Sequence, residues 1–243
     1  MLRVLGVIPA RLASSRLPRK VLREIAGRPM VWHVWERARH APALSELLVA
    51  TDSEEVMSAC ARFGMPAMLT SAAHPSGTDR VWEVAQQRPA DVYVNIQGDE
   101  PLITEEHIER LVAPFRLRLE TQVTTLCIRA TVDELPNPNV NKVVRDAEGR
   151  ALYFSKHPIP YDRAGINPVR YKHIGLYAYR GAALDRYHSL PPSSLEQAER
   201  LEQLRFLENG IPIEVVETNA PTIGVDTEED LRAVEAILAA PRR

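Results

Sequence analysis

The chain passes from an apolar run into a basic loop at Val7-Ile8-Pro9-Ala10-Arg11-Leu12-Ala13-Ser14-Ser15-Arg16-Leu17-Pro18-Arg19-Lys20. Residues 2–8 have the length and composition of a strand, and residues 29–40 have the pattern of a helix. Pro9 and Pro18 exclude a helix from the connection between them. Lys and Arg side chains, Ser hydroxyls and backbone N–H groups all donate hydrogen bonds to anions. The loop after the first strand is therefore a candidate anion site.

The charge of the chain is unevenly distributed. Residues 1–40 hold nine Lys/Arg and two Glu, a net charge of +7, whereas the remaining residues hold 21 Lys/Arg and 30 Asp/Glu, a net charge of −9. A solvated surface loop is the simplest interpretation of a basic loop. A cationic segment on an otherwise acidic chain instead favours a small polyanionic ligand bound at one place. The overall net charge of −2 argues against general nucleic-acid binding, so we expect no nucleic-acid partner.

The composition is typical of an ordinary globular protein of 243 residues, with 45% hydrophobic and 26% charged residues. Cys60 and Cys127 lie in apolar stretches without metal-ligand spacing, which favours buried thiols. Arg3 and Pro9 interrupt the apolar run near the N-terminus, so it does not have a signal-peptide pattern. No segment approaches the ~18 apolar residues of a membrane span. We therefore expect a cytoplasmic protein without a membrane span.

Strand-length apolar runs alternate with amphipathic helical patterns in the first half of the chain. Asp52, with Glu55 three residues later, is expected to cap the second helix. The alternation predicts an α/β fold with a Rossmann-like, mostly parallel sheet sandwiched by helices. The predicted strands are 2–8, 47–51, 66–69, 92–96 and 122–128, and the predicted helices are 29–40, 53–63, 77–87 and 104–119.

The pattern changes over residues 131–192, which contain many prolines and extended runs. We interpret this part as an antiparallel elaboration of the main sheet, so residues 1–243 are expected to form a single α/β domain. Residues 194–208 have the pattern of one helix, and residues 211–216 that of a strand. Thr227 and Asp230 form a capping box for a last helix that reaches about residue 239. The extended runs lie at 142–144, 151–155 and 171–179, with a hairpin turn at 146–149.

Several polar clusters follow predicted strands, where open α/β sheets bind ligands. Asp99 follows the strand at 92–96, and Asp226 precedes the last helix. Because Mg²⁺ takes one or two carboxylates together with phosphate oxygens, these residues and the basic loop suggest a magnesium–phosphate site. Alternatively, Asp226 only caps its helix. The segment 75–80 is either a loop with an N-cap or a source of hydroxyl and N–H donors for a nucleotide.

Four common motifs are absent from the sequence. The chain has no G-x-x-x-x-G-K-[ST], which excludes a P-loop NTPase, and no G-x-G-x-x-G after the first strand, which argues against dinucleotide binding. It also lacks G-x-S-x-G and H-E-x-x-H.

Taken together, the motifs resemble those of the CMP-Kdo synthetases, the 3-deoxy-manno-octulosonate cytidylyltransferases. The resemblance covers essentially the whole chain. It implies a nucleotide-diphospho-sugar transferase-like fold and a homodimer. It also implies transfer of CMP from CTP to 3-deoxy-manno-octulosonate (Kdo), for lipopolysaccharide biosynthesis, with Mg²⁺ as cofactor. The segments that carry it are 8–20, 50–52, 74–80, 95–101, 151–155, 159–160, 173–177, 201–205 and 224–227.

The resemblance also implies roles for individual residues. The catalytic residues would be Arg11, Lys20, Asp99 and Asp226, of which Asp99 and Asp226 would hold the metal. The nucleotide would be bound by Ala10, Arg11, Ser14, Ser15, Arg16, Lys20, Ser76, Gly77, Arg80 and Gln97. The sugar would be bound by Arg163, His173, Tyr177, Glu202 and Gln203, and the elaboration at 131–192 would serve dimerisation and sugar binding.

Some positions depart from the family pattern and leave alternatives open. Lys156-His157-Pro158 replaces the usual Arg and small residues, which concerns the identity of the sugar. A cytidylyltransferase for 8-amino-Kdo or a sialic acid is therefore an alternative. A non-catalytic module that binds nucleic acid through the basic segment is a second one, and the net charge of −9 on the remaining residues argues against it. Further departures are Arg19 for Gly, Val21 for Pro and Asn141 for an apolar residue.

Overall fold

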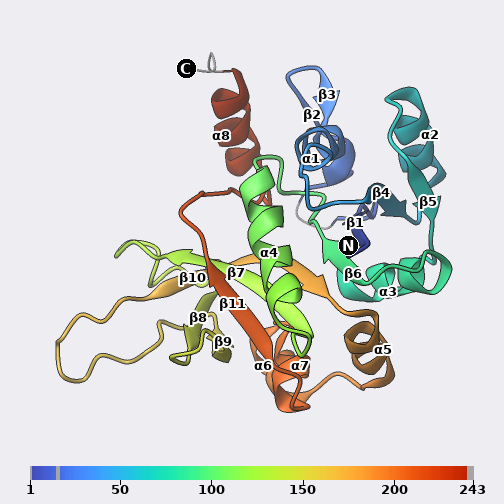
Figure 1. Cartoon of the computed structure of the whole chain (residues 1–243). Coiled ribbons are helices and arrows are strands. Elements are labelled where there is room, and N and C mark those ends of the chain that lie inside the picture. The colour runs from blue at the N-terminus through green and yellow to red at the C-terminus, as the bar shows by residue number, and fades with distance from the viewer. Residues whose placement is uncertain (1, 15–16, 240–243) are drawn as a thin grey trace. The chain divides into compact units, whose positions relative to one another are not determined.

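The computed structural model describes residues 2–14 and 17–239, and it groups the chain into two compact units (Figure 1). The first unit comprises Met1–Glu109 and Thr222–Arg243, and the second comprises Arg110–Pro221. The predicted elaboration at 131–192 falls inside the second unit. In the described residues, no helix is both long enough and apolar enough to cross a membrane.

The first unit is built on four parallel strands in the order β6-β1-β4-β5 (Figure 1). The strands are β1 (Val4–Pro9), β4 (Glu46–Thr51), β5 (Ala67–Leu69) and β6 (Val92–Asn95). Between them run α1 (Met30–Ala38), α2 (Glu54–Arg62) and α3 (Gly77–Gln87). The side chains of β1 and β6 are almost fully buried, as expected for parallel strands that are covered on both faces. The predicted parallel α/β arrangement is confirmed here.

The basic loop after β1 is anchored to the end of the chain by a small apolar cluster. A 3₁₀ turn, η1 (Lys20–Leu22), and a short hairpin of β2 (Glu24–Ile25) and β3 (Arg28–Pro29) follow the loop. The last helix, α8 (Glu228–Ala239), begins with the predicted Thr227–Asp230 capping box. The cluster comprises Leu17, Ile25, Met30, Leu102, Val225, Leu231 and Val234.

The second unit combines antiparallel and parallel pairing. Its strands are β7 (Val123–Arg129), β8 (Lys142–Arg145), β9 (Ala151–Ser155), β10 (Tyr171–Tyr179) and β11 (Ile213–Glu217). Strand β10 runs antiparallel to β7 and β8, β8 and β9 form an antiparallel hairpin, and β11 runs parallel to β7. The helix α4 (Glu105–Leu117) begins in the first unit and continues into the second.

The predicted turn at 146–149 closes the β8–β9 hairpin. The Asp146 carboxylate accepts hydrogen bonds from the backbone N–H groups of Glu148 and Arg150, at 2.9 and 2.7 Å. Gly149 has a φ of +85°, a conformation that glycine adopts without strain. The predicted extended runs and their turn are thus confirmed.

Two predictions about helices are wrong, and one helix was missed. Ser53, not Asp52, caps α2, because its hydroxyl accepts from the Val56 N–H. The predicted helix at 194–208 is two helices, α6 (Ser194–Glu199) and α7 (Leu204–Glu208), separated by Arg200 in the left-handed region with φ of +55°. The elaboration also contains a helix that we did not predict, α5 (Gly181–Ser189).

Candidate active site

A lysine joins the two predicted metal-binding carboxylates in the first unit. Lys20 Nζ donates to Asp99 Oδ2 at 2.5 Å and to Asp226 Oδ1 at 3.0 Å. The Lys20 side chain is 14% exposed, whereas those of Asp99 and Asp226 are 29% and 44% exposed, so the ammonium is the most buried part of the cluster. Burial alone would lower the pKa of Lys20, but attraction and hydrogen bonding by Asp99 and Asp226 outweigh it and raise that pKa. Three residues from distant parts of the sequence therefore meet as one charged cluster.

Backbone contacts fix the two carboxylate-bearing loops against each other. The Val225 N–H donates to the Asp99 carbonyl at 2.9 Å, and the Thr222 hydroxyl donates to Glu100 Oε2 at 2.6 Å. On the other side, a Cβ at Gly98 would lie only 2.8 Å from the carbonyl oxygen of Pro9. Glycine therefore lets the loop pass close to the end of β1. These contacts hold Asp99 and Asp226 beside the basic loop.

The same two carboxylates fit a magnesium ion. Both already contact a single cationic group, and Mg²⁺ in proteins is held by one or two carboxylates, with water and substrate phosphates as the remaining ligands. The described residues contain no cluster of three or more His, Cys, Asp or Glu that could hold a metal. A metal at this place would thus need oxygens from outside the protein to complete its coordination.

Ala10 and the start of α3 line the ends of β1 and β6. The Ala10 N–H donates to the Ala50 carbonyl at 2.8 Å, and the Ala10 carbonyl accepts from the Thr51 hydroxyl at 2.6 Å. Ser76 caps α3, accepting from the Asp79 N–H and donating to the Asp79 carboxylate. A Cβ added at the next residue, Gly77, would meet Pro9 and Asn95 at ordinary van der Waals distances.

Arg80 is buried beneath the loop that precedes α3. Its side chain is 3% exposed and donates to Asp52 Oδ2 at 3.0 Å and to the Thr70 hydroxyl at 2.5 Å. His74 in the same loop pairs with Glu83 on α3. In the structure Arg80 therefore holds the loop in place, and its predicted contact with a nucleotide stays a prediction. No local pattern in the sequence identifies Asp52 as the partner of Arg80.

The remaining predicted nucleotide residues are more open. Arg11 is exposed and Ser14 is half-buried, while Ser15 and Arg16 lie outside the described residues. Gln97 is half-buried, and its Nε2 donates to Asn95 Oδ1 at 3.4 Å. Sequence analysis did not single out Asn95, a fully buried amide at the end of β6.

His173 is a buried neutral imidazole in the second unit. Burial lowers its pKa to about 3, because there is no water to stabilise the charged ring. Its Nε2 lies 2.8 Å from the Thr125 hydroxyl, which itself donates to the Leu176 carbonyl at 2.8 Å. His173 Nε2 therefore carries the proton and donates to Thr125. The Nδ1 atom is left as a buried acceptor with no hydrogen-bond partner.

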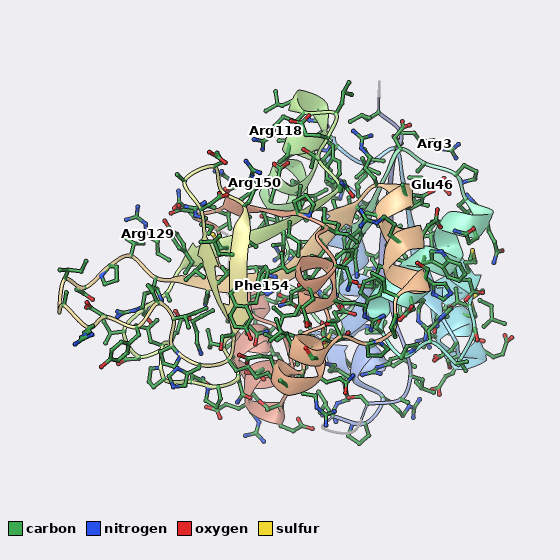
Figure 2. All side chains as sticks on the ribbon, turned by 90° about the horizontal axis from the view of Figure 1, so that it is seen from below. Arg3, Glu46, Arg118, Arg129, Arg150 and Phe154 are labelled. Atoms are coloured by element: carbon green, nitrogen blue, oxygen red, sulfur yellow. The ribbon has the colours of Figure 1, made fainter. Side chains whose placement is uncertain are left out.

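A bulge in β10 brings His173 close to Tyr177. The pairing with β7 shifts between Ile174 and Tyr177, so β10 has extra residues there. In a regular strand, residues four apart are separated by about 13 Å, since each residue rises about 3.3 Å. Here the two ring centroids are 5.4 Å apart. Phe154 of β9, labelled in Figure 2, packs edge-on against His173 at 5.0 Å.

The other predicted sugar-binding residues of the second unit differ in their surroundings. Gln203 is 3% exposed, and its Nε2 is buried without a hydrogen-bond partner. Glu202 is half-buried and accepts from the Tyr187 hydroxyl at 3.4 Å. Arg163 is exposed in a turn of the irregular segment between β9 and β10. The structure thus places His173 and Tyr177 in contact and leaves Arg163 on the surface.

The family model for cytidylyltransferases matches residues 5–216. The chain therefore belongs to the cytidylyltransferase family. It is 59% identical over 238 residues to a protein of Acidobacterium capsulatum named 3-deoxy-manno-octulosonate cytidylyltransferase, covering 98% of this chain and 97% of that one. A protein of Koribacter versatilis with the same name is 56% identical over 97% of this chain and 90% of its own.

Solved structures agree with this assignment. A CMP:2-keto-3-deoxy-manno-octonic acid synthetase complexed with CTP superimposes with a TM-score of 0.94 and 45% identity, over 98% of both chains. A glucose-1-phosphate thymidylyltransferase from Bacillus anthracis, described as putative in its source, superimposes with a TM-score of 0.70 and 17% identity, over 99% of this chain and 97% of that one. The second likeness concerns the fold alone, and it confirms the predicted nucleotidyltransferase-like architecture.

Proposed function

We propose that this protein is a 3-deoxy-manno-octulosonate cytidylyltransferase, which converts CTP and Kdo into CMP-Kdo and pyrophosphate. The observation that carries the proposal is the cluster of Lys20, Asp99 and Asp226 at the ends of the parallel strands. It combines an ammonium that suits phosphate with two carboxylates that suit magnesium. The similarity to proteins of this name, over nearly the full length of both chains, supports the same reaction.

The reaction is an in-line displacement at phosphorus. The anomeric hydroxyl of Kdo attacks the α-phosphorus of CTP, a new P–O bond forms, and the bond to the bridging oxygen breaks to release pyrophosphate. Lys20, with Arg11 and Ser14 of the basic loop, would hold the triphosphate and offset its charge. The protein contributes mainly by positioning the reactants and by stabilising charge.

Asp99 and Asp226 would hold Mg²⁺ in this reaction. A bound magnesium ion supplies Lewis-acid stabilisation of phosphate oxygens. The Val225–Asp99 and Thr222–Glu100 hydrogen bonds hold the two carboxylate loops together, so both carboxylates would be available to one ion. Gly98 allows the close approach of one of these loops to β1.

The second unit would supply the sugar-binding residues. A sugar acid carries many hydroxyl groups, and buried polar atoms without partners are costly unless a ligand pairs with them. His173 Nδ1 is an acceptor of this kind, and Gln203 Nε2 is a donor. Because His173 is neutral, it suits a sugar hydroxyl rather than the carboxylate. The carboxylate would be recognised by a donor such as Gln203 or the exposed Arg163.

We further propose that the protein acts in the cytoplasm, where CTP is available, in lipopolysaccharide biosynthesis, and that it forms a homodimer. Exposed apolar side chains in the second unit support self-association. Leu152, Tyr161 and Ile166 are 62%, 85% and 76% exposed. Sedimentation at micromolar concentration tests the dimer, and a monomer there would refute it.

The function is tested by measuring pyrophosphate release from CTP with a panel of sugar acids and Mg²⁺. Kdo, 8-amino-Kdo and a sialic acid are compared, and the nucleotide product is identified by mass. We expect the highest kcat/KM with Kdo. Turnover of a sialic acid without turnover of Kdo would overturn the proposal. A preference for 8-amino-Kdo would instead indicate that Lys156-His157-Pro158, which departs from the family pattern, determines the choice of sugar.

A further inference from the structure

The Lys20 ammonium lies where the proposed metal would be bound. Its Nζ contacts one oxygen of Asp99 and one oxygen of Asp226, at 2.5 and 3.0 Å. These are the same two carboxylates that the proposed function assigns to Mg²⁺. A divalent cation and the ammonium therefore need the same oxygens, and the two cations repel each other.

The backbone of Lys20 is fixed, whereas its charged end is carried on a flexible stem. The Arg23 N–H donates to the Lys20 carbonyl at 3.1 Å, and the Leu22 N–H donates to the Arg19 carbonyl at 2.9 Å, which closes the 3₁₀ turn. Four carbon atoms separate this backbone from the ammonium, so the charge can swing away without unfolding the turn. Its next partner would be an anion that approaches the basic loop, such as the triphosphate.

We propose that Lys20 is a resident counter-ion that competes with the divalent cation for Asp99 and Asp226, and that it leaves them when a triphosphate offers it new partners. The inference rests on the proposed function, because it takes the anion to be the substrate triphosphate. Without nucleotide, the ammonium offsets the repulsion between the two carboxylates. With nucleotide, phosphate oxygens accept the ammonium and also complete the coordination of the metal.

A linkage between metal and nucleotide follows from this exchange. In the free protein the metal has to displace Lys20 and finds only two carboxylate ligands, so it binds weakly. Whatever draws the ammonium away strengthens metal binding, and by reciprocity the metal strengthens triphosphate binding. The alternative hypothesis is that Lys20 serves only as a phosphate ligand. In that case, its removal would leave the metal affinity of the free protein unchanged.

The test measures Mn²⁺ binding to the nucleotide-free protein by electron paramagnetic resonance, with Mn²⁺ as the probe for Mg²⁺. We expect Lys20→Met and Lys20→Gln to bind Mn²⁺ about tenfold more tightly than the unsubstituted protein, since the metal no longer displaces a charge-assisted hydrogen bond. The matched control is Arg23→Met. It removes the same charge three residues away, from a side chain that pairs with Glu228. Its Mn²⁺ affinity should stay within about twofold, because exposed charges are screened.

The outcomes separate this inference from the proposed function. Equal or weaker Mn²⁺ binding by both Lys20 variants would overturn the inference. It would also be overturned if the double variant Lys20→Met/Asp99→Asn kept the increase in Mn²⁺ affinity, because the metal would then lie elsewhere. Thermal melting of each variant checks that it is folded, and Lys20→Gln retains hydrogen bonding if Lys20→Met is unstable. Failure of the unsubstituted protein to release pyrophosphate from CTP and Kdo would overturn the function itself, whatever the Mn²⁺ result.

Discussion

A single methyl group at Gly98 tests whether the approach of the Asp99 loop to β1 matters. In Gly98→Ala the new Cβ would lie 2.8 Å from the Pro9 carbonyl oxygen, with Val21 and Ile8 side chains at 3.5 and 3.6 Å on its other sides. The loop must move by about 0.6 Å to relieve the contact, and such overpacking costs about 1–3 kcal/mol. For a chain of this size we expect Tm to fall by about 3–10 °C.

The same displacement moves Asp99, so we also expect a loss of turnover. A misplacement of about 1 Å near reacting groups can cost about 100-fold, and we expect a loss between about 10- and 100-fold in kcat. Differential scanning calorimetry gives Tm, and pyrophosphate release with saturating CTP and Kdo gives kcat. A variant with the Tm and kcat of the unsubstituted protein would refute the reasoning.

Gly77→Ala is the matched control for this experiment. Its added Cβ meets Pro9 Cγ at 3.7 Å and Asn95 Nδ2 at 3.8 Å, which are ordinary contacts. Gly77 is the first residue of α3, where alanine is tolerated, so Tm should not fall. Because Gly77 is predicted to lie against the nucleotide, we expect a higher KM for CTP instead. The two glycines should therefore separate a steric requirement of the fold from a requirement of the ligand.

Three further predictions concern charged and titratable groups. Asp99→Asn should reduce kcat by at least about 100-fold with Tm little changed, since one charged ligand is lost while the shape is kept; near-normal kcat would reduce Asp99 to a structural residue. Arg80→Lys should lower the free energy of unfolding by about 1–3 kcal/mol, because a lysine cannot reach Asp52 and Thr70 at once; unchanged denaturant midpoints would contradict this. The pKa of His173 is lowered to about 3, so the unfolded chain takes up a proton below about pH 6.5 that the folded chain does not. As the pH falls from about 6.5 to about 3, the free energy of unfolding should therefore decrease by up to about 1.4 kcal/mol per pH unit. Urea titrations at several pH values measure this slope, and His173→Gln should flatten it.

The elements that sequence predicted best have strong local signals. The helix α3 and the strands β9 and β10 begin and end at the predicted residues. Ser76 caps the helix directly, and the strands have runs of apolar and aromatic residues flanked by turn residues. Local chemistry decides these boundaries, so tertiary contacts do not shift them.

The helix predicted at 194–208 failed because of a contact that local patterns do not contain. Arg205 donates to both oxygens of Glu196, at 2.7 and 2.5 Å, and both side chains are largely buried. In one continuous helix, nine residues would separate the two by about 13.5 Å along the axis. The bidentate pair therefore requires a break, which Arg200 provides in the left-handed conformation. No glycine or proline marks this position in the sequence.

In the candidate site, too, the positions of residues after strands were predictable from the sequence, whereas the pairing of charged side chains was not. The position of Asp99 after a buried strand was predictable, and ligands bind beyond the carboxyl ends of such strands. The contact of Asp99 with Lys20 was not predictable, because several basic residues of the loop could have paired with this carboxylate. The pair of Arg80 with Asp52 was not predicted either, although a buried guanidinium needs a carboxylate nearby.

The net charge of +7 on residues 1–40 overstates the positive field that an anion meets, because several of these cations are paired with carboxylates from later in the chain. Arg19 pairs with Glu55, Arg23 with Glu228, and Lys20 with two carboxylates. A polyanion arriving alone would have to take the ammonium and leave those carboxylates unpaired. A divalent cation arriving alone would have to leave the ammonium unpaired. Entering together, the metal takes the carboxylates and the triphosphate takes the ammonium, so the arrangement favours a metal–triphosphate complex over either component.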